Sequence, residues 1–426
     1  MSQKIKILAG VIAACLANSP VQAVQFDGFI TVGGAVHDDK NKNRYIGSLG
    51  DRGITDKFSF ETDTRFGLQI SSEVAKDMSV VSQILGTGVD GNFNAVVEWA
   101  YVDYEVNENI SIRAGKIKQP VYLVNDYVEV GYAYPWIRPP VEVYYLNNPL
   151  NTVNGVEILF QYDVGPGTLS LQPYFGSNRD DIPNTSGQGF FEAESITGID
   201  IKYSGRGYTA HFSNFTCDVK LNGQLQSVPT VFGFPVNIDL SGTGECEVSS
   251  VGLNLDINNI VVYSEWQKRT TTDTLARPFG QQDAFYATFG YRFGKYLPHI
   301  TFASIDGTSG KAGPFAVTCD ADPTAALGSE QSNCAGATGS ASANSAAQVT
   351  NFPVAVQTSV TAGLRYELND SAALKFEYSV VDVDTVPQGS PGNPFGINFG
   401  LFDTSFTGQA PTEKVGITSI ALDVIF

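Results

Sequence analysis

The sequence predicts an all-β protein, a transmembrane antiparallel β-barrel of about 16 strands around a polar interior. Apolar and polar residues alternate through many strand-length runs, which is the period of a strand with two different faces. Short turns and long connections alternate along the chain, as they do in outer-membrane barrels. No run of 18 apolar residues follows position 23, so no helix is expected to cross a membrane.

Residues 1–23 are expected to be a signal peptide that is cleaved on export. Two lysines precede an apolar run from Ile7 to Leu16, and small residues lead to a cleavage position after Ala23. A lipoprotein cleavage site at Cys15 is the alternative. The rest of the chain, 24–426, is expected to form one barrel domain in the cell outer membrane, reached through the periplasm.

The net charge of −18 restricts the partners of the chain. Nucleic acid is not expected, because phosphates need a basic surface. An acidic exterior is compatible with the outer membrane, where divalent cations bridge anionic groups. The expected surroundings are therefore membrane lipid and lipopolysaccharide.

The alternation is clearest from Phe58 to Val74. Apolar residues such as Phe66 and Leu68 fall on one face, and polar residues such as Arg65 on the other. In a barrel the first face meets lipid and the second meets water. The same pattern recurs at 156–163, 285–293, 354–367, 374–380 and 420–426.

Long connections are expected at 37–57, 117–150, 176–192, 216–247, 270–282, 306–352 and 384–412. An even strand count places both termini on the short-turn side. Aromatic residues lie beside the short turns and predict an interfacial girdle: Tyr104, Tyr162, Tyr203, Tyr208, Tyr291, Phe293, Tyr366 and Phe426.

The connection 117–150 is expected to fold into the lumen as an inward third long loop. It is too long for a hairpin and contains several prolines, which rule out a continuous ladder or helix. It is also rich in tyrosine, and rings on a long connection must pack against something. A folded surface lid is the alternative.

Charged residues of both signs are candidates for a pore constriction. Those on the loop are Asp126, Glu129, Arg138 and Glu142, and those on the inward face of the wall are Arg65, Arg113, Arg365 and Lys375. Acids opposed to bases across a neck would orient dipolar solutes. The strands that carry Arg65, Arg365 and Lys375 become near neighbours when the barrel closes. The alternative is that these charges only solvate a polar lumen.

Four cysteines remain after export. Their spacing favours Cys217–Cys246 and Cys319–Cys334, each pair within its own long connection, although four cysteines allow three pairings. The oxidising periplasm favours disulfides over metal. No metal site and no cofactor are expected, because there is no CxxC and the three histidines are isolated.

An enzyme is the weakest of the alternatives. His211 and Ser213 share one face of a strand, so a Ser–His pair is geometrically feasible. The run resembles the His-x-Ser-Asn of outer-membrane phospholipases, but Phe215 stands where that family has glycine. We expect no enzymatic activity.

As a whole the chain resembles a Gram-negative trimeric porin. The likeness is carried by the signal peptide, the strand count, the long loop after the fifth strand and the terminal Phe426. The run from Arg113 to Lys116 also resembles the strand that enters this loop in phosphate-selective porins. The Pro-Glu-Phe-Gly-Gly type of loop motif is absent.

This resemblance implies a water-filled channel for passive diffusion of small hydrophilic solutes and ions. It implies a homotrimer, in which Gly28 and Gly34 on the outward face would allow close approach of subunits. It also implies that the barrel assembly machinery reads Phe426. A substrate-specific channel for an anion or a small organic acid is the alternative, supported by the tyrosine-rich loop.

Overall fold

The computed structural model describes residues 24–42, 44–45, 53–89, 92–144, 151–181, 189–222, 224–226, 236–239, 241–272, 281–308, 317–319, 356–383, 401–403 and 413–426. The expected signal peptide and the pair Cys319–Cys334 lie outside the part whose side chains are described.

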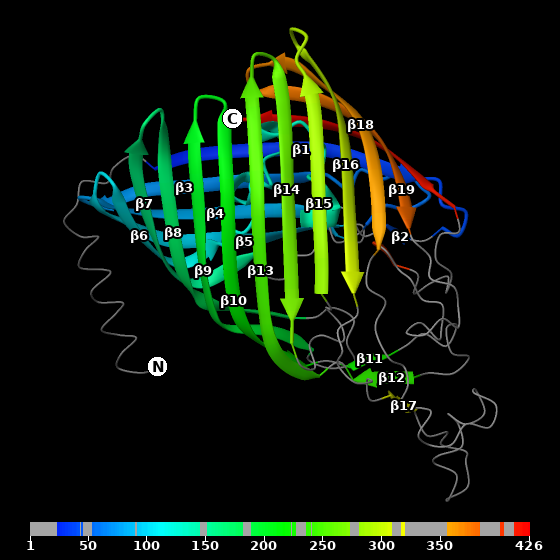
Figure 1. Cartoon of the computed structure of the whole chain (residues 1–426), viewed down its shortest axis with the longest axis horizontal. Coiled ribbons are helices and arrows are strands. Elements are labelled where there is room, and N and C mark those ends of the chain that lie inside the picture. Colours follow the sequence, from blue (N-terminus) through cyan, green and yellow to red (C-terminus); the bar gives the residue numbers. More distant parts are fainter. Residues whose placement is uncertain are drawn as a thin grey trace, which may run out of the picture.

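Sixteen antiparallel strands form a closed barrel (Figure 1), which confirms the predicted fold class and strand count. The strands are β1 (Gln25–His37), β3 (Arg65–Ala75), β4 (Met78–Val89), β5 (Asn92–Asn107), β6 (Ile110–Lys118), β7 (Thr152–Val164), β8 (Gly167–Asp181), β9 (Phe190–Gly205), β10 (Tyr208–Asn222), β13 (Gly242–Ile257), β14 (Ile260–Thr271), β15 (Gln281–Tyr291), β16 (Tyr296–Thr308), β18 (Gln357–Asn369), β19 (Ala372–Val383) and β21 (Val415–Ile425).

The barrel closes where β1 pairs with both β3 and β21, with Phe29 opposite Ile425. Strands adjacent in sequence pair all the way round, so every connection is a hairpin. Short segments lie outside the ring: β2 (Arg44–Tyr45) pairs with β20 (Phe402–Asp403), and β11 (Gln224–Gln226), β12 (Val236–Asp239) and β17 (Val317–Cys319) form a small sheet. This sheet lies at the end of the barrel away from the short turns (Figure 1).

The barrel is inverted relative to a water-soluble protein. Large apolar side chains such as Phe175, Phe289 and Ile300 are exposed on the outside, whereas charged side chains such as Glu265 and Lys375 are buried inside. The predicted girdle residues with more than a third of their surface exposed are Tyr104, Tyr162, Tyr291, Phe293 and Phe426. A lipid-facing wall with interfacial aromatics explains both observations.

The strand predicted from Phe58 is wrong in its first half, because β3 begins at Arg65. The preceding residues form a turn held by local side-chain bonds: Thr62 Oγ1 donates to the Ser59 carbonyl, and the Ser59 hydroxyl accepts from the Glu61 amide. Short polar side chains compete in this way with ladder formation. The inward direction of Arg65 was nevertheless correctly predicted.

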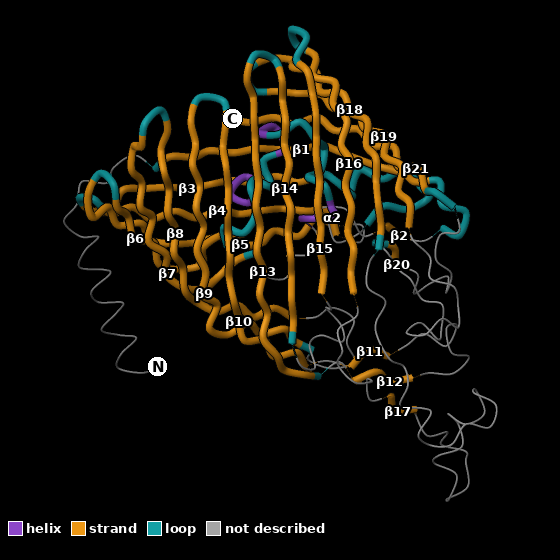
Figure 2. The backbone as a smooth tube through the Cα atoms, in the orientation of Figure 1, coloured by secondary structure: helices purple, strands orange, loops and turns teal. Residues whose placement is uncertain are grey.

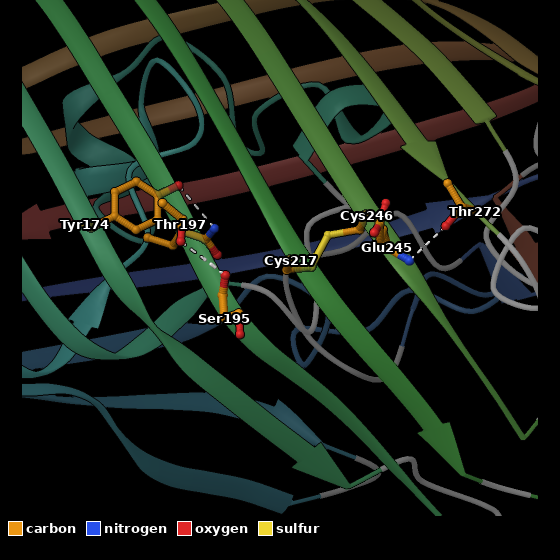
Figure 3. Close-up of a disulfide and its surroundings, with 8 residues drawn as sticks. Tyr174, Ser195, Thr197, Cys217, Glu245, Cys246 and Thr272 are labelled. Atoms are coloured by element: carbon orange, nitrogen blue, oxygen red, sulfur yellow. Dashed lines mark hydrogen bonds between the residues drawn. A yellow bond between two sulfur atoms is a disulfide. The ribbon is translucent and has the colours of Figure 1, made fainter.

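The Cys217–Cys246 disulfide is confirmed, but its place differs from the prediction (Figure 3). The two residues were expected inside a long connection. They are instead directly opposite each other on neighbouring strands β10 and β13, which extend beyond them to Asn222 and back to Gly242. The disulfide therefore links two neighbouring strands of the barrel wall.

The two glycines expected to permit close subunit approach are covered by their own chain. The Phe426 ring lies against Gly28, and the Phe58 ring lies 2.7 Å from where a Cβ of Gly34 would stand. These glycines accommodate aromatic rings rather than leaving a groove open for a neighbour.

Candidate functional site: the lumen and its inward loop

The connection between β6 and β7 runs inside the barrel. It contains the short helices η1 (Asn125–Tyr127), η2 (Gly131–Ala133) and α2 (Val141–Tyr144), drawn in purple within the ring of strands in Figure 2. Its backbone bonds to Glu265 of β14, to Arg65 of β3 and to Lys375 of β19. Because β14 and β3 lie on opposite sides of the ring, only an interior segment reaches both.

The aromatic side chains of the loop pack against the wall rather than facing water. Tyr122, Tyr134 and Trp136 are each 1% exposed. The Trp136 ring lies 4.7 Å from the Tyr263 ring of β14, and its Nε1 donates to the Thr288 and Thr301 hydroxyls at 2.9 and 3.1 Å. Buried rings with satisfied polar atoms anchor the loop.

Glu265, a buried carboxylate of β14, forms hydrogen bonds with two positions of the loop. Glu265 accepts hydrogen bonds from the Leu123 amide at 2.9 Å, the Tyr144 hydroxyl at 2.7 Å and the Ser250 hydroxyl at 2.7 Å. Several oriented donors can hold a buried carboxylate without a cation. Glu265 therefore binds the loop at Leu123 and again at Tyr144.

Lys375 tethers the loop on the other side of the ring. Its Nζ donates to the carbonyl oxygens of Gly131 and Trp136, at 2.6 Å each, and pairs with Asp423 at 2.9 Å. Asp423 in turn accepts from the Thr31 hydroxyl at 2.6 Å. All three donors of the ammonium group are used, and the side chain is 1% exposed.

Two predicted wall arginines act in the same way. Arg65 Nε donates to the Glu129 carbonyl at 2.7 Å, and its Nη2 donates to the Tyr134 hydroxyl at 2.8 Å. Arg365 Nη1 donates to the carbonyls of Tyr132 and Tyr134, at 2.5 and 2.8 Å. These cations therefore lie beneath the loop and hold it to the wall.

The later loop charges are buried as well. Arg138 pairs with Asp63 at 3.0 Å and donates to the Ser419 hydroxyl. Glu142 accepts from the Gln357 amide at 2.9 Å. Neither side chain faces open water, because Arg138 is 9% and Glu142 1% exposed.

Charges remain accessible on the opposite wall. Asp126 of the loop, 49% exposed, pairs with Lys202 of β9 at 2.5 Å. Arg113, 27% exposed, pairs with Asp103 and Glu157 at 2.7 and 3.2 Å. Desolvation of Asp126 opposes its ionisation, but the adjacent Lys202 ammonium outweighs it and lowers the carboxyl pKa below 3.8.

The structure thus divides the predicted constriction residues into two groups. Asp126 and Arg113 belong to an accessible charged strip on the β5–β9 side, together with Lys202. The remaining six, with Glu129 lying 3.8 Å from Lys118, belong to the tethers of the loop, and none is more than 14% exposed: Arg65, Arg138, Arg365, Lys375, Glu129 and Glu142. The strands that carry Arg65, Lys375 and Arg365 are near neighbours, as predicted: β18 pairs with β19, and β21 and β1 lie between β19 and β3.

Several residues that bind the loop or its charged groups were not predicted from the sequence. Lys202, Asp63, Glu265 and Asp423 each complete an interaction described above. For Asp423 a signal existed: Leu422 and Val424 are outward in the alternation, which turns the intervening carboxylate inward. No sequence pattern indicates which loop carbonyl each cation meets.

The feasible Ser–His pair is not formed. His211 Nε2 lies 2.6 Å from Asp200 Oδ2, and the Ser213 hydroxyl donates to the Val121 carbonyl of the loop. Both side chains are buried between wall and loop. The described residues contain no cluster that could hold a metal ion and no helix suited to spanning a membrane.

No family model and no curated protein matches this chain. Solved structures do. OmpT expressed in the outer membrane of Vibrio cholerae matches with a TM-score of 0.53 at 10% identity, covering 96% of this chain and 99% of that one. Its in-vitro folded trimer form matches at 0.52 and 9% identity, covering 95% and 100%. The outer membrane channel DcaP of Acinetobacter baumannii matches at 0.49 and 12%, covering 95% and 97%.

At such low identity the two Vibrio cholerae matches show a shared fold. The chain is a closed 16-stranded barrel with the fold of these outer-membrane proteins, and its fifth barrel strand leads into a loop that enters the lumen.

Proposed function

We propose that the protein forms a water-filled outer-membrane channel through which small hydrophilic solutes and ions diffuse passively. The observation that carries this proposal is the division of lumen charge. Buried cations hold the loop against one side of the barrel, while Asp126 and Arg113 remain accessible on the other, where Lys202 pairs with Asp126. A loop held in this way narrows the lumen, and the accessible charges act on passing ions.

Ion selectivity in planar bilayers tests this assignment. Lys202→Gln removes one positive charge from the accessible strip and should shift the reversal potential in a salt gradient towards cations. Asp126→Asn should shift it towards anions. Lys220→Gln is the matched control, because Lys220 pairs with Glu194 near the long-loop end of the wall. Equal reversal potentials in the parent and the three variants would show that ions do not pass along this strip.

A substrate-specific channel has less support. The tyrosine-rich loop favoured it, but the largest rings of that loop are packed against the wall and do not face the open lumen. Saturable uptake of a single anion or organic acid, with little conductance in its absence, would favour this alternative.

An enzyme has the least support, because His211 bonds to Asp200 and the Ser213 hydroxyl is occupied by a loop carbonyl. We therefore propose no catalytic activity. Lipid hydrolysis by the pure protein, lost in Ser213→Ala, would contradict this.

A homotrimer embedded in lipid and lipopolysaccharide, and inserted by the barrel assembly machinery through Phe426, is part of the same proposal. The trimer form of the similar Vibrio cholerae barrel supports it. Migration of unboiled protein as a monomer in mild detergent would argue against it.

A further inference from the structure

A cavity lies between the loop and the wall, on the side of the loop away from the accessible strip. It is bounded by loop residues 136 and 138–142 and by strands β16, β18, β19 and β21, and its volume is about 50 Å³. Ser359 and Thr361 line it from the first half of β18, and Val381 from the last part of β19. The cavity is therefore nearer to the long loops than to the short turns.

Glu377 presents to this cavity a carboxyl group that forms no ion pair with a lysine or arginine of the described residues. Its Oε1 accepts the Ile137 amide at 2.9 Å, and Oε2 takes no hydrogen bond from the described part of the chain. The nearest basic group is the His299 Nε2, 3.9 Å away. The residue is 8% exposed, so its carboxylate is largely withdrawn from bulk water.

Neither Arg138 nor Lys375 forms an ion pair with Glu377, because each is paired with another acid. Arg138 pairs with Asp63, and Lys375 pairs with Asp423. Glu142, the second acid in the lining, accepts a hydrogen bond from the Gln357 amide and from no other described residue. Two acids therefore line the cavity against one cation, Arg138, and a buried carboxylate is costly unless it is paired.

The remaining lining is half polar and half apolar. Hydroxyl groups come from Thr301, Ser359 and the hydrogen-bonded pair Thr361 and Ser379, whose oxygens are 2.7 Å apart. The Trp136 ring, Pro139, Pro140, Val381 and Ile417 supply the apolar half. Such a mixture of a few convergent polar groups within an apolar wall is typical of sites for small organic ligands.

We propose that this cavity is a subsite for the ammonium group of a small organic amine. The three N–H donors of an ammonium group match the Glu377 carboxylate and the surrounding hydroxyls. The apolar half of the lining accommodates the carbon chain of the amine. A bare inorganic cation would make no apolar contact with it. The proposal rests on the channel function only in that the amine reaches the cavity from a water-filled lumen.

Tryptophan fluorescence tests the proposal directly, because Trp136 lines the cavity. In purified protein carrying Trp99→Phe and Trp266→Phe, titration with n-propylammonium chloride should change the remaining emission to saturation. Neutral n-propanol at the same concentrations should not. In the same background, Glu377→Gln should raise the apparent Kd by about tenfold or more, because it removes a charge-assisted hydrogen bond but keeps the shape.

Glu194→Gln is the matched control, since this β9 acid pairs with Lys220 on the far wall, and its Kd should stay at the parent value. An unchanged Kd in Glu377→Gln, equal binding of n-propanol, or displacement of the amine by equimolar potassium would each overturn the proposal.

Ser359→Leu guards against failure of Glu377→Gln to fold. It fills the cavity without altering the carboxylate, and heat-modifiable electrophoretic mobility reports whether the barrel has formed. Loss of amine binding in a folded Ser359→Leu barrel supports the site, and retained binding overturns it. Conductance of the parent protein is measured on the same samples. A barrel that conducts ions but does not bind the amine rejects the subsite and leaves the proposed channel function intact.

Discussion

Replacement of Lys375 by methionine probes how the loop is held in the lumen. Methionine has similar length but no donor, so Lys375→Met removes two bonds to the carbonyls of Gly131 and Trp136 and the ion pair with Asp423. The hydroxyl of Thr31 still donates a hydrogen bond to the Asp423 carboxylate.

The magnitude follows from burial. Breaking a buried ion pair by removal of one partner costs about 3–5 kcal/mol, because the other charge stays desolvated. The two carbonyl bonds contribute to the same free energy and are not additive with it, since all three share one ammonium group. A loss of about 3 kcal/mol or more raises the population of the undocked loop by roughly a hundredfold.

Two measurements check this expectation. Trp136 is 1% exposed in the docked loop, so acrylamide should quench its fluorescence more strongly in Lys375→Met than in the parent, both carrying Trp99→Phe and Trp266→Phe. Single-channel recordings should show larger and noisier openings. Lys295→Met, at an exposed short turn, is the control and should match the parent. Unchanged quenching and conductance in folded Lys375→Met would refute the assignment of Lys375 as a tether.

The remaining predictions concern the loop, the disulfide and pH. Deleting 125–143 should raise conductance and the size limit for solutes, and equal values in an assembled barrel would mean that the loop does not narrow the path. Replacing Cys217 and Cys246 by serine should cost about 2–4 kcal/mol of stability, measured by denaturant unfolding, and peptide mapping without reductant should show the bond. The pKa of the Asp126 carboxyl is lowered, so its contribution to loop docking is present at pH values above 3.8 and is lost only as the pH falls further. Conductance that changed between about pH 5 and pH 7 in the parent but not in Asp126→Asn would contradict this.

The sequence by itself determined the barrel and the direction of its side chains. Alternation has a period of two, so a residue such as Arg65, Lys375 or Glu377 can be placed inward without knowledge of its neighbours. Turn and loop lengths then determine the strand count, and the even count places the termini together. These are local properties, and a single sequence contains them.

Side-chain hydrogen bonds that compete with strand pairing explain where the predicted strand bounds are wrong. Ser59 and Thr62 form side-chain bonds that replace the expected start of β3, although the alternation continues through them. Cys217 and Cys246 were paired correctly from proximity in sequence, but only the strand register shows that they lie opposite each other on the wall.

The roles of the inward charges were decided by the tertiary structure alone. Arg65, Arg365 and Lys375 were expected to face the water path, and the loop covers them instead, because its carbonyl oxygens meet their donors. Alternation states which face a cation occupies but not what lies above that face. Packing of a loop across the lumen brings together residues more than 200 positions apart, so the division between buried tether and accessible charge exists only in the folded barrel.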